Sequence, residues 1–193
     1  MINVWKHFKT ITYHKYLVMK GCFAVGLYRQ GMLHDLPKYT PEEFVVGIKY
    51  YQGTRSPNNA EREDKGYSSA WLHHKGRNKH HYEYWIDYSC REIEGGMKPS
   101  AMPVQYVVEM VMDRIAASKV YLGKNYTDQS PLEYLMQGKC NHTLMHPKTY
   151  KQLRILLTML AEEGEEKTFS YIRTVVLQKK PRAVRCKCVC VRR

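Results

Sequence analysis

The stretch PVQYVVEMVMDRIAASKVYL, residues 103–122, predicts a long α-helix, because its apolar residues recur at helical spacing behind an initial proline. One face of this helix would carry Tyr106, Met110, Asp113, Ala117 and Val120. A carboxylate on a mostly apolar face is costly unless it is paired or bound to a metal. Asp113 is therefore a candidate metal ligand, and pairing with a buried arginine is the alternative.

The rest of the chain also shows mainly helical spacing. Upstream, one face of a first helix would carry His14 together with Val4, Phe8, Ile11, Val18 and Cys22. Thr40 and Pro41 are typical of a helix start, with Glu43 as the capping-box partner. The expected helices cover residues 4–22, 25–34, 40–53, 68 onward, 103–122, 131–137, 148–162 and 165–178, the last three separated by Gly138 and Gly164. Residues 53–66 and 95–103 are expected to be loops.

These elements predict an all-α fold, because no internal repeat and no series of strands is evident in the sequence. A chain of 193 residues suits one domain with a small extension. We expect a helical core over residues 1–138, a helical extension over 139–178 packed on that core, and a basic, cysteine-containing tail over 179–193.

The positive charge is concentrated at the end of the chain. The formal net charge is +13, yet residues 1–166 hold 22 basic and 18 acidic residues and carry only +4. Residues 167–193 hold nine basic residues and no acidic one. Such a tail is either a solvated basic end or a segment that binds nucleic acid by electrostatic attraction.

The cysteines and the hydropathy pattern indicate a cytoplasmic protein. There is no apolar run long enough for a membrane span, and the first residues lack the apolar core of a signal peptide. Three isolated cysteines are expected to be small buried residues, namely Cys22, Cys90 and Cys140. The tail motif C-x-C-x-C departs from the spacing of structural zinc sites, which favours free thiols at Cys186, Cys188 and Cys190.

Further candidate metal ligands lie on separate predicted elements. They are His14, the pair His34–Asp35, the doublets His73/His74 and His80/His81, and Asp113. Each has an ordinary explanation, such as a core histidine, a helix end or a polar surface loop. Their joint occurrence indicates a metal site, because imidazoles and carboxylates from several elements form such sites. Adjacent residues on a helix point about 100° apart, which favours one member of each doublet. We favour His74 over His73 and retain both His80 and His81.

The order His14, His34–Asp35, Asp113 resembles the HD superfamily of metal-dependent phosphohydrolases. The likeness extends to the sequence HDLPK, with Lys38 three residues after the aspartate. The segments WLHHKGRNKHHYEYW and GKNYTD more closely resemble an uncharacterised family from bacteria and their phages, known only as a domain of unknown function. That closer resemblance covers roughly residues 3–137 and implies no activity.

The HD resemblance implies a helical bundle that binds one or two divalent ions of Mn, Mg, Co, Ni, Zn or Fe. The implied ligands are His14, His34, Asp35, His74, His80, His81 and Asp113. An activated water would attack phosphorus in a nucleotide or another small phosphate ester. Asp35 would orient that water, and Lys38, to which the resemblance also points, would be catalytic by holding phosphate oxygens and stabilising charge in the transition state. Lys75, Arg77 and Asn78 lie next to the candidate ligands and are further candidate substrate-binding residues, with ordinary surface charge as the alternative for the cations. Asn78 and Glu83 have a second interpretation, as groups that support a ligand histidine.

Two other functions fit the same residues. Some HD-fold proteins hold two irons and oxidise their substrates with O₂, and the extra histidines permit such a centre. A non-catalytic protein with a structural metal and a basic tail that binds nucleic acid is the other alternative. We expect no membrane partner, and the sequence does not fix the oligomeric state.

Overall fold

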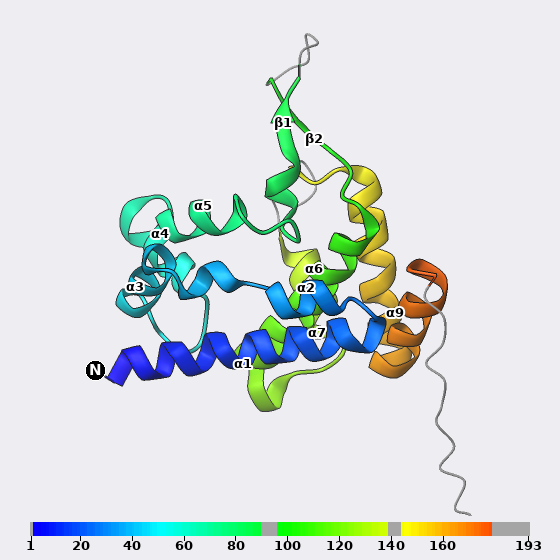
Figure 1. Ribbon diagram of the computed structural model, residues 1–193, viewed down its shortest axis with the longest axis horizontal. Coiled ribbons are helices and arrows are strands. Elements are labelled where there is room, and N and C mark those ends of the chain that lie inside the picture. Colours follow the sequence, from blue (N-terminus) through cyan, green and yellow to red (C-terminus); the bar gives the residue numbers. More distant parts are fainter. Residues whose placement is uncertain (1, 90–95, 139–143, 179–193) are drawn as a thin grey trace, which may run out of the picture.

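The computed structural model describes residues 2–89, 96–138 and 144–178 (Figure 1). It confirms the predicted all-α class, with one small two-stranded sheet. The helices up to the sheet are α1 (Ile2–Val25), α2 (Tyr28–Leu33), the 3₁₀ helix η1 (Leu36–Tyr39), α3 (Pro41–Lys49), α4 (Pro57–Lys65), α5 (Ser69–Lys75) and η2 (Tyr82–Trp85). The strands β1 (Ile86–Tyr88) and β2 (Met97–Pro99) pair antiparallel. They are followed by α6 (Val104–Leu122), η3 (Gly123–Asn125), α7 (Ser130–Gln137), α9 (Pro147–Tyr171) and the π-helix η4 (Ile172–Val176).

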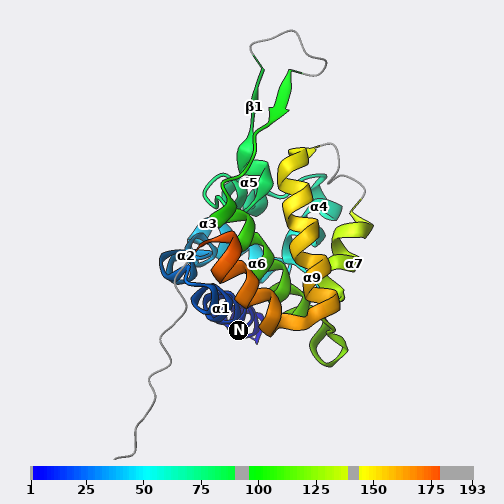
Figure 2. The same cartoon turned by 90° about the vertical axis from the view of Figure 1, so that its right-hand side faces the viewer.

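The helix α6, predicted from residues 103–122, occupies the centre of the molecule. It packs against α1, α7 and α9, and Figure 2 shows it between α1 and α9. Its buried residues include Val107, Val108, Met110, Val111, Met112, Ile115 and Ala116. Burial on nearly all sides makes α6 a rigid support for the side chains that it presents. None of the helices in the described part of the chain is long and apolar enough to cross a bilayer.

The predicted apolar face of α1 is correct in the middle of the helix and wrong at its start. Ile11, Val18 and Cys22 are buried, whereas Val4 and Phe8 are exposed. The helical repeat continues past the point where other elements cover the helix, so the sequence pattern overstates the buried face. Where α1 crosses α6, Gly21 allows the close approach, because a Cβ there would lie 2.8 Å from a sulfur of α6.

The start of α3 is predicted correctly, but the expected capping box is absent. Thr40 precedes the helix without a side-chain cap, and its hydroxyl donates to the carbonyl of Pro37 at 2.9 Å. The carboxylate of Glu43 is buried and faces imidazoles instead of the helix start. Glu43, which was expected to cap the helix, therefore contacts buried histidines in the interior of the protein.

The expected loop over residues 53–66 is wrong, because its second half forms α4. Pro57 opens this helix, and Gly66, in the left-handed region at φ 79°, ends it. The helix lacks the apolar repeat that reveals an amphipathic helix, since its sequence is PNNAEREDK. Its fold depends on Glu61, whose carboxylate accepts hydrogen bonds from the hydroxyls of Ser68 and Ser69 at 2.7 Å.

Replacing Glu61 with alanine should lower the free energy of unfolding by about 1–3 kcal/mol, because the buried hydroxyl of Ser68 loses its acceptor. Burial raises the pKa of this carboxyl, but hydrogen bonds from Ser69 and Ser68 lower it further, to about 2. The stabilisation by Glu61 is therefore fully present at pH values above the ordinary pKa of glutamate. It is lost as the pH falls toward 2. Urea unfolding at several pH values measures the effect. The exposed Glu63→Ala, which loses only a surface pair with Arg55, is the control.

The predicted break between the two C-terminal helices is confirmed. Residues 148–162 and 165–178 were expected as two helices, and within α9 the backbone leaves the helical region at Gly164, with φ 78° and ψ 175°, so that two helical segments meet there at a kink. The expected loop over 95–103 contains β2. Cys22 is buried as predicted, while Cys90, Cys140 and the tail 179–193 with its three cysteines lie outside the described residues.

Candidate metal centre

The histidines and aspartates identified in the sequence converge from five segments of the chain. These segments are α1 with His14, the α2–η1 link with His34 and Asp35, α5 with His74, the turn before η2 with His80 and His81, and α6 with Asp113. Their ligand atoms form two groups, each with all members within 4.8 Å of one another, and a third such group joins His34 and His80 to Glu109. Group A is His14, His34, Asp35 and Asp113, and group B is Asp35, His74, His80 and His81.

Asp35 belongs to both groups, and its two oxygens face different histidines. Its Oδ2 lies 3.2 Å from Nε2 of His34 and 3.6 Å from Nε2 of His14. Its Oδ1 lies 3.2 Å from Nε2 of His74 and 3.4 Å from Nε2 of His80. One carboxylate thus connects the two groups, with one oxygen toward each.

The backbone at Asp35 explains how two consecutive residues reach the same interior. Asp35 has φ 53°, in the left-handed region that residues other than glycine seldom adopt. This conformation ends α2 and starts η1, and the carbonyl of Asp35 then accepts from the amide of Lys38 at 3.0 Å. Both His34 and Asp35 are buried, at 2% and 1% exposure. Unfavourable backbone conformations of this kind cluster at functional sites.

Asp113 completes group A from the opposite side. Its Oδ1 lies 3.0 Å from Nε2 of His14 and 3.6 Å from Nε2 of His34. It faces imidazoles, so the alternative of a buried arginine partner is wrong. The neighbouring Arg114 places its guanidinium 5.6 Å from the ring centre of Tyr134 instead.

Several ligand atoms have no conventional partner. Nε2 of His34, Nε2 of His80, Nε2 of His81 and Oδ1 of Asp35 are buried and make no hydrogen bond within the described part of the structure. Buried polar atoms without partners are costly and uncommon, and several side by side indicate a missing ion or ligand. The donor set of nitrogen and carboxylate oxygen, with these unpartnered atoms, fits a divalent metal ion.

Two buried glutamates orient the histidines from behind. Oε1 of Glu109 lies 3.0 Å from Nδ1 of His34 and 3.2 Å from Nδ1 of His80. Oε2 of Glu43 lies 2.8 Å from Nδ1 of His74. When a carboxylate accepts from Nδ1, the other ring nitrogen is left free to bind a metal. Glu109 thus supports one histidine of each group, and Glu43 supports group B.

Sequence reasoning missed both glutamates, although one signal was available. Glu109 precedes Asp113 by four residues, so the two carboxylates share one face of an apolar helix. Glu43 gave no such signal, because its position also suits a capping box. His73 lies outside both groups, with its Nδ1 2.6 Å from the other oxygen of Glu43.

The electrostatics favour the metal-binding forms of Asp113 and His81. Burial raises the pKa of Asp113, but the hydrogen bond with His14 and the nearby imidazole of His34 outweigh it and hold the pKa well below its usual range. Burial lowers the pKa of His81 well below its ordinary value, and the neighbouring His80 adds to this effect. An ionised carboxylate and a neutral imidazole are the forms that coordinate a metal.

The predicted substrate-binding residues lie at different distances from the two groups. Nζ of Lys38 lies 2.5 Å from Oδ2 of Asp35. Asn78 is buried and donates to the carbonyl of His74 at 2.9 Å, so it holds the histidine turn together. Arg77 is exposed and donates to the carbonyl of His73, and Lys75 is half-buried. The structure therefore brings Lys38 to the candidate metal centre, whereas Asn78 supports the backbone at His74.

Glu43→Gln tests the supporting role of this glutamate. Removing the charge behind His74 should weaken metal binding by about 10- to 100-fold at group B and leave group A unchanged. Competition titration with a chromogenic chelator resolves the two affinities. Equal weakening of both sites, or none, would contradict the assignment of Glu43 to group B.

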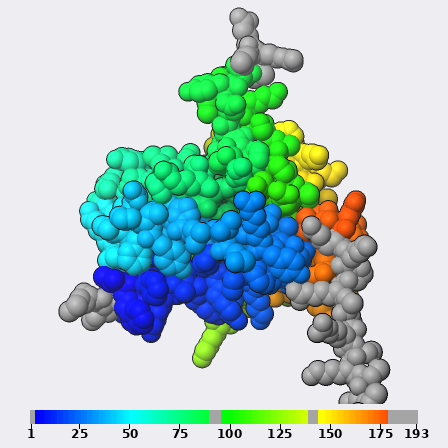
Figure 3. All heavy atoms as spheres, viewed as in Figure 1, coloured from blue at the N-terminus to red at the C-terminus, as the bar shows by residue number. Residues whose placement is uncertain are grey.

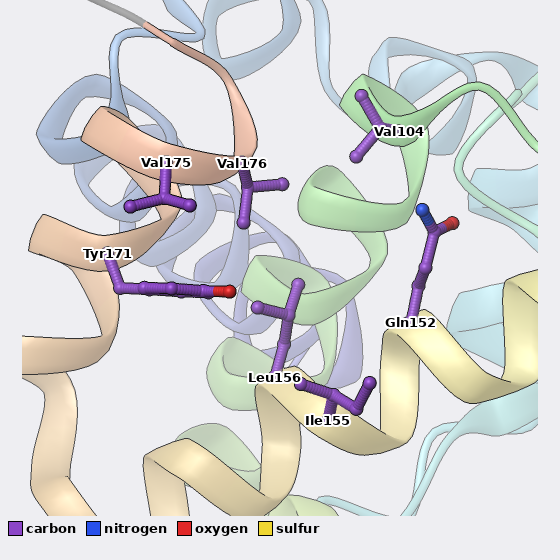
Figure 4. A pocket seen from close by; sticks show the side chains of 7 residues that line it. All are labelled: Val104, Gln152, Ile155, Leu156, Tyr171, Val175 and Val176. Atoms are coloured by element: carbon purple, nitrogen blue, oxygen red, sulfur yellow. The ribbon is translucent and has the colours of Figure 1, made fainter.

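A separate pocket lies between α6, α9 and η4 (Figure 4). It has a volume of about 370 Å³ and is lined by Val104, Gln152, Ile155, Leu156, Tyr171, Val175 and Val176. None of these residues belongs to group A or group B. The lining is mainly aliphatic, in contrast to the polar side chains of groups A and B.

Comparison with known proteins gives the family of the chain and no activity. No curated protein and no solved structure matched the sequence. Residues 3–159 match a family of unknown function, DUF5662, over most of the chain. The match includes every residue of groups A and B and both supporting glutamates. The chain therefore belongs to the family of unknown function DUF5662.

Proposed function

We propose that this protein is a metal-dependent phosphohydrolase of the HD type that acts on a nucleotide or another small phosphate ester. The observation that supports this most strongly is Asp35, whose two oxygens face two histidine groups. A carboxylate in that position suits two adjacent ions, an arrangement that phosphatases and nucleases use for displacement at phosphorus.

The ligands suit a transition metal better than Mg. Group A offers two imidazoles and two carboxylates, and group B offers three imidazoles and one carboxylate. Mg prefers all-oxygen ligands, whereas Mn, Fe, Co, Ni and Zn accept imidazole readily. A bound ion of this kind would supply Lewis acidity toward a phosphoryl oxygen and would acidify a coordinated water.

Substrate would approach from the side of Lys38 and Asp113. Their side chains are 28% and 17% exposed, whereas those of His34 and Asp35 are at 0% and 1%. Lys38 would hold a phosphoryl oxygen there, because the Asp35 carboxylate keeps its ammonium charged and raises its pKa against the opposing effect of burial. Asp113 would accept a hydrogen bond from a water on the same side.

Lys38→Met should lower kcat/KM for phosphate release by about 100-fold, because one cation near the transferred phosphoryl group is lost. Metal content should stay unchanged, since Lys38 is not in either ligand group. Steady-state kinetics with elemental analysis of the same samples separates these effects. A Lys38→Met protein with full activity would contradict the role of this lysine, and Lys151→Met, at an exposed position on α9, is the control.

The proposal is tested by elemental analysis of the purified protein, followed by phosphate release from nucleoside monophosphates and p-nitrophenyl phosphate. Activity that appears with Mn, Co or Ni, and disappears with a chelator, supports a phosphohydrolase. Full metal occupancy without hydrolysis of any phosphate ester would contradict it.

The same pair of groups also fits a two-iron oxygenase, because imidazoles and a shared carboxylate are suitable iron ligands. Iron as the bound metal, a visible absorption band and consumption of O₂ would favour that function. The binding of nucleic acid by the tail 179–193 stays a prediction, and salt-sensitive binding that is lost without those residues would support it.

A further inference from the structure

The solvent-facing side of α1 carries an unusual set of aromatic side chains. In Figures 1 and 3 this helix, in blue, runs along the lower edge of the molecule. Four of its aromatic side chains are exposed, namely Trp5, Phe8, Tyr13 and Tyr16, and Trp5 is the most exposed of them, at 59%. We call these four side chains, with the lysines described next, the α1 face.

The charge on this helix is entirely positive. Its 24 residues contain four lysines and no acidic residue, as the sequence INVWKHFKTITYHKYLVMKGCFAV shows. Lys6, Lys9 and Lys20 are exposed beside the aromatic rings. Nζ of Lys9 lies 5.1 Å from the ring centre of Trp5. A partner of the α1 face would be complementary to cations and to aromatic rings at the same time. This combination indicates a polyanion that carries flat rings of its own.

The rings are arranged as a stacking surface. Trp5 and Phe8 lie nearly parallel, with an interplanar angle of 14° and ring centres 5.8 Å apart. Bases of single-stranded nucleic acid stack on such rings without regard to sequence, while lysines hold the backbone phosphates. Bases in a duplex are already stacked on one another, so a duplex offers the rings much less.

The α1 face leads to the candidate metal centre. Phe8 contacts Tyr39 edge to face, with ring centres 6.1 Å apart, and Thr12 lies 3.1 Å from the Tyr39 hydroxyl. Tyr39 directly follows Lys38, which reaches Asp35. A strand lying on α1 would therefore extend toward the side from which substrate approaches group A.

We propose that the α1 face binds single-stranded nucleic acid, with bases on Trp5 and Phe8 and phosphates at the exposed lysines. The further step, that a phosphate ester of the bound strand reaches group A, rests on the function proposed above. Binding itself requires neither metal nor hydrolysis.

Other occupants fit the α1 face less well. At about 100° per residue, Lys9 and Lys20 fall between Tyr16 and Tyr13 around the helix, so a lipid-facing stripe would bury lysines. A second copy of the chain would bring two sets of lysines together without an acidic residue on either helix. Charge complementarity thus favours an anionic strand.

The first experiment measures fluorescence anisotropy of a labelled 20-residue oligothymidylate with the full chain in a buffer containing a chelator. Trp5→Ala/Phe8→Ala should weaken binding by at least about tenfold, since base–aromatic stacking is removed while the net charge stays the same. Tyr88→Ala, which removes a ring 79% exposed on β1, should bind like the wild type. Thermal unfolding confirms that each variant is folded.

A second variant tests the lysines. Changing Lys6, Lys9 and Lys20 together to glutamine should reduce the slope of log K against log salt by about 2, since single-stranded binding loses about 0.7 per phosphate contact. The matched control changes three exposed lysines elsewhere, Lys124, Lys148 and Lys151, to glutamine and should keep the slope.

Wild-type affinity in both variants would overturn the proposal and assign any binding to other residues, the tail included. Binding to anionic phosphatidylserine vesicles that depends on Trp5 and Phe8, without binding to the oligonucleotide, would overturn it in favour of a membrane surface. Because these assays contain no metal, a negative result does not bear on the proposed phosphohydrolase function. Conversely, a protein that binds the strand but releases no phosphate would contradict the proposed hydrolase function and would not contradict strand binding.

Discussion

Asp35→Ala should abolish the candidate metal centre. The variant loses one ligand from group A and one from group B at the same time, because each oxygen of Asp35 faces a different group. We expect metal content to fall from about two ions per chain to well below one, and phosphate release to fall at least about a thousandfold. Elemental analysis and phosphate release from the same preparation measure both effects.

The design of this experiment depends on its control. Asp87→Ala removes an exposed aspartate on β1 and should retain full metal content and activity. Asp35→Asn keeps the shape of the side chain and removes the charge, so it separates loss of ligation from loss of packing. Unchanged metal content in both Asp35 variants would show that this residue is not a shared ligand.

Glu109→Gln should weaken the binding of both metal ions. Glu109 faces Nδ1 of His34 in group A and Nδ1 of His80 in group B. Loss of a carboxylate behind a ligand histidine costs about 10- to 100-fold in metal affinity, and here two histidines share the same carboxylate. Chelator competition should show weaker binding at both sites, with activity reduced at limiting metal and largely restored at excess metal.

The comparison with Glu43→Gln makes this prediction specific. Glu43 contacts His74 in group B, so its loss should affect one site, whereas loss of Glu109 should affect two. Glu166→Gln, on the exposed side of α9, serves as the unaffected control. If Glu109→Gln weakened metal binding at only one of the two sites, the assignment of this glutamate to both groups would be contradicted.

The fold was predictable where a local repeat coincides with packing. The apolar repeat of residues 103–122 predicted α6 because that helix is buried on nearly all sides. The same reasoning missed α4, whose polar sequence is held in place by Glu61 and the serines that follow it. It also overstated the buried face of α1, since no local pattern tells where neighbouring elements stop covering a helix.

The candidate site was predictable in its residue types and less so in its arrangement. Histidines and aspartates on separate predicted elements indicated the ligands, and helix geometry indicated that one member of the doublet His73/His74 would ligate. The sharing of Asp35 between two groups depends on its left-handed backbone and on the approach of α5 to the link between α2 and η1, and no local sequence pattern shows either of them. Glu43 acquires its role only because α5 packs against α3.

The most direct test of the two-group arrangement is a crystal structure of the metal-loaded protein, with anomalous diffraction recorded at the absorption edge of the bound metal. Two peaks are expected, one near His14, His34 and Asp113, the other near His74, His80 and His81, with Asp35 between them. A single peak that avoids Asp35, or no peak in protein saturated with Mn, Fe, Co, Ni or Zn, would show that Asp35 does not join two metal-binding groups.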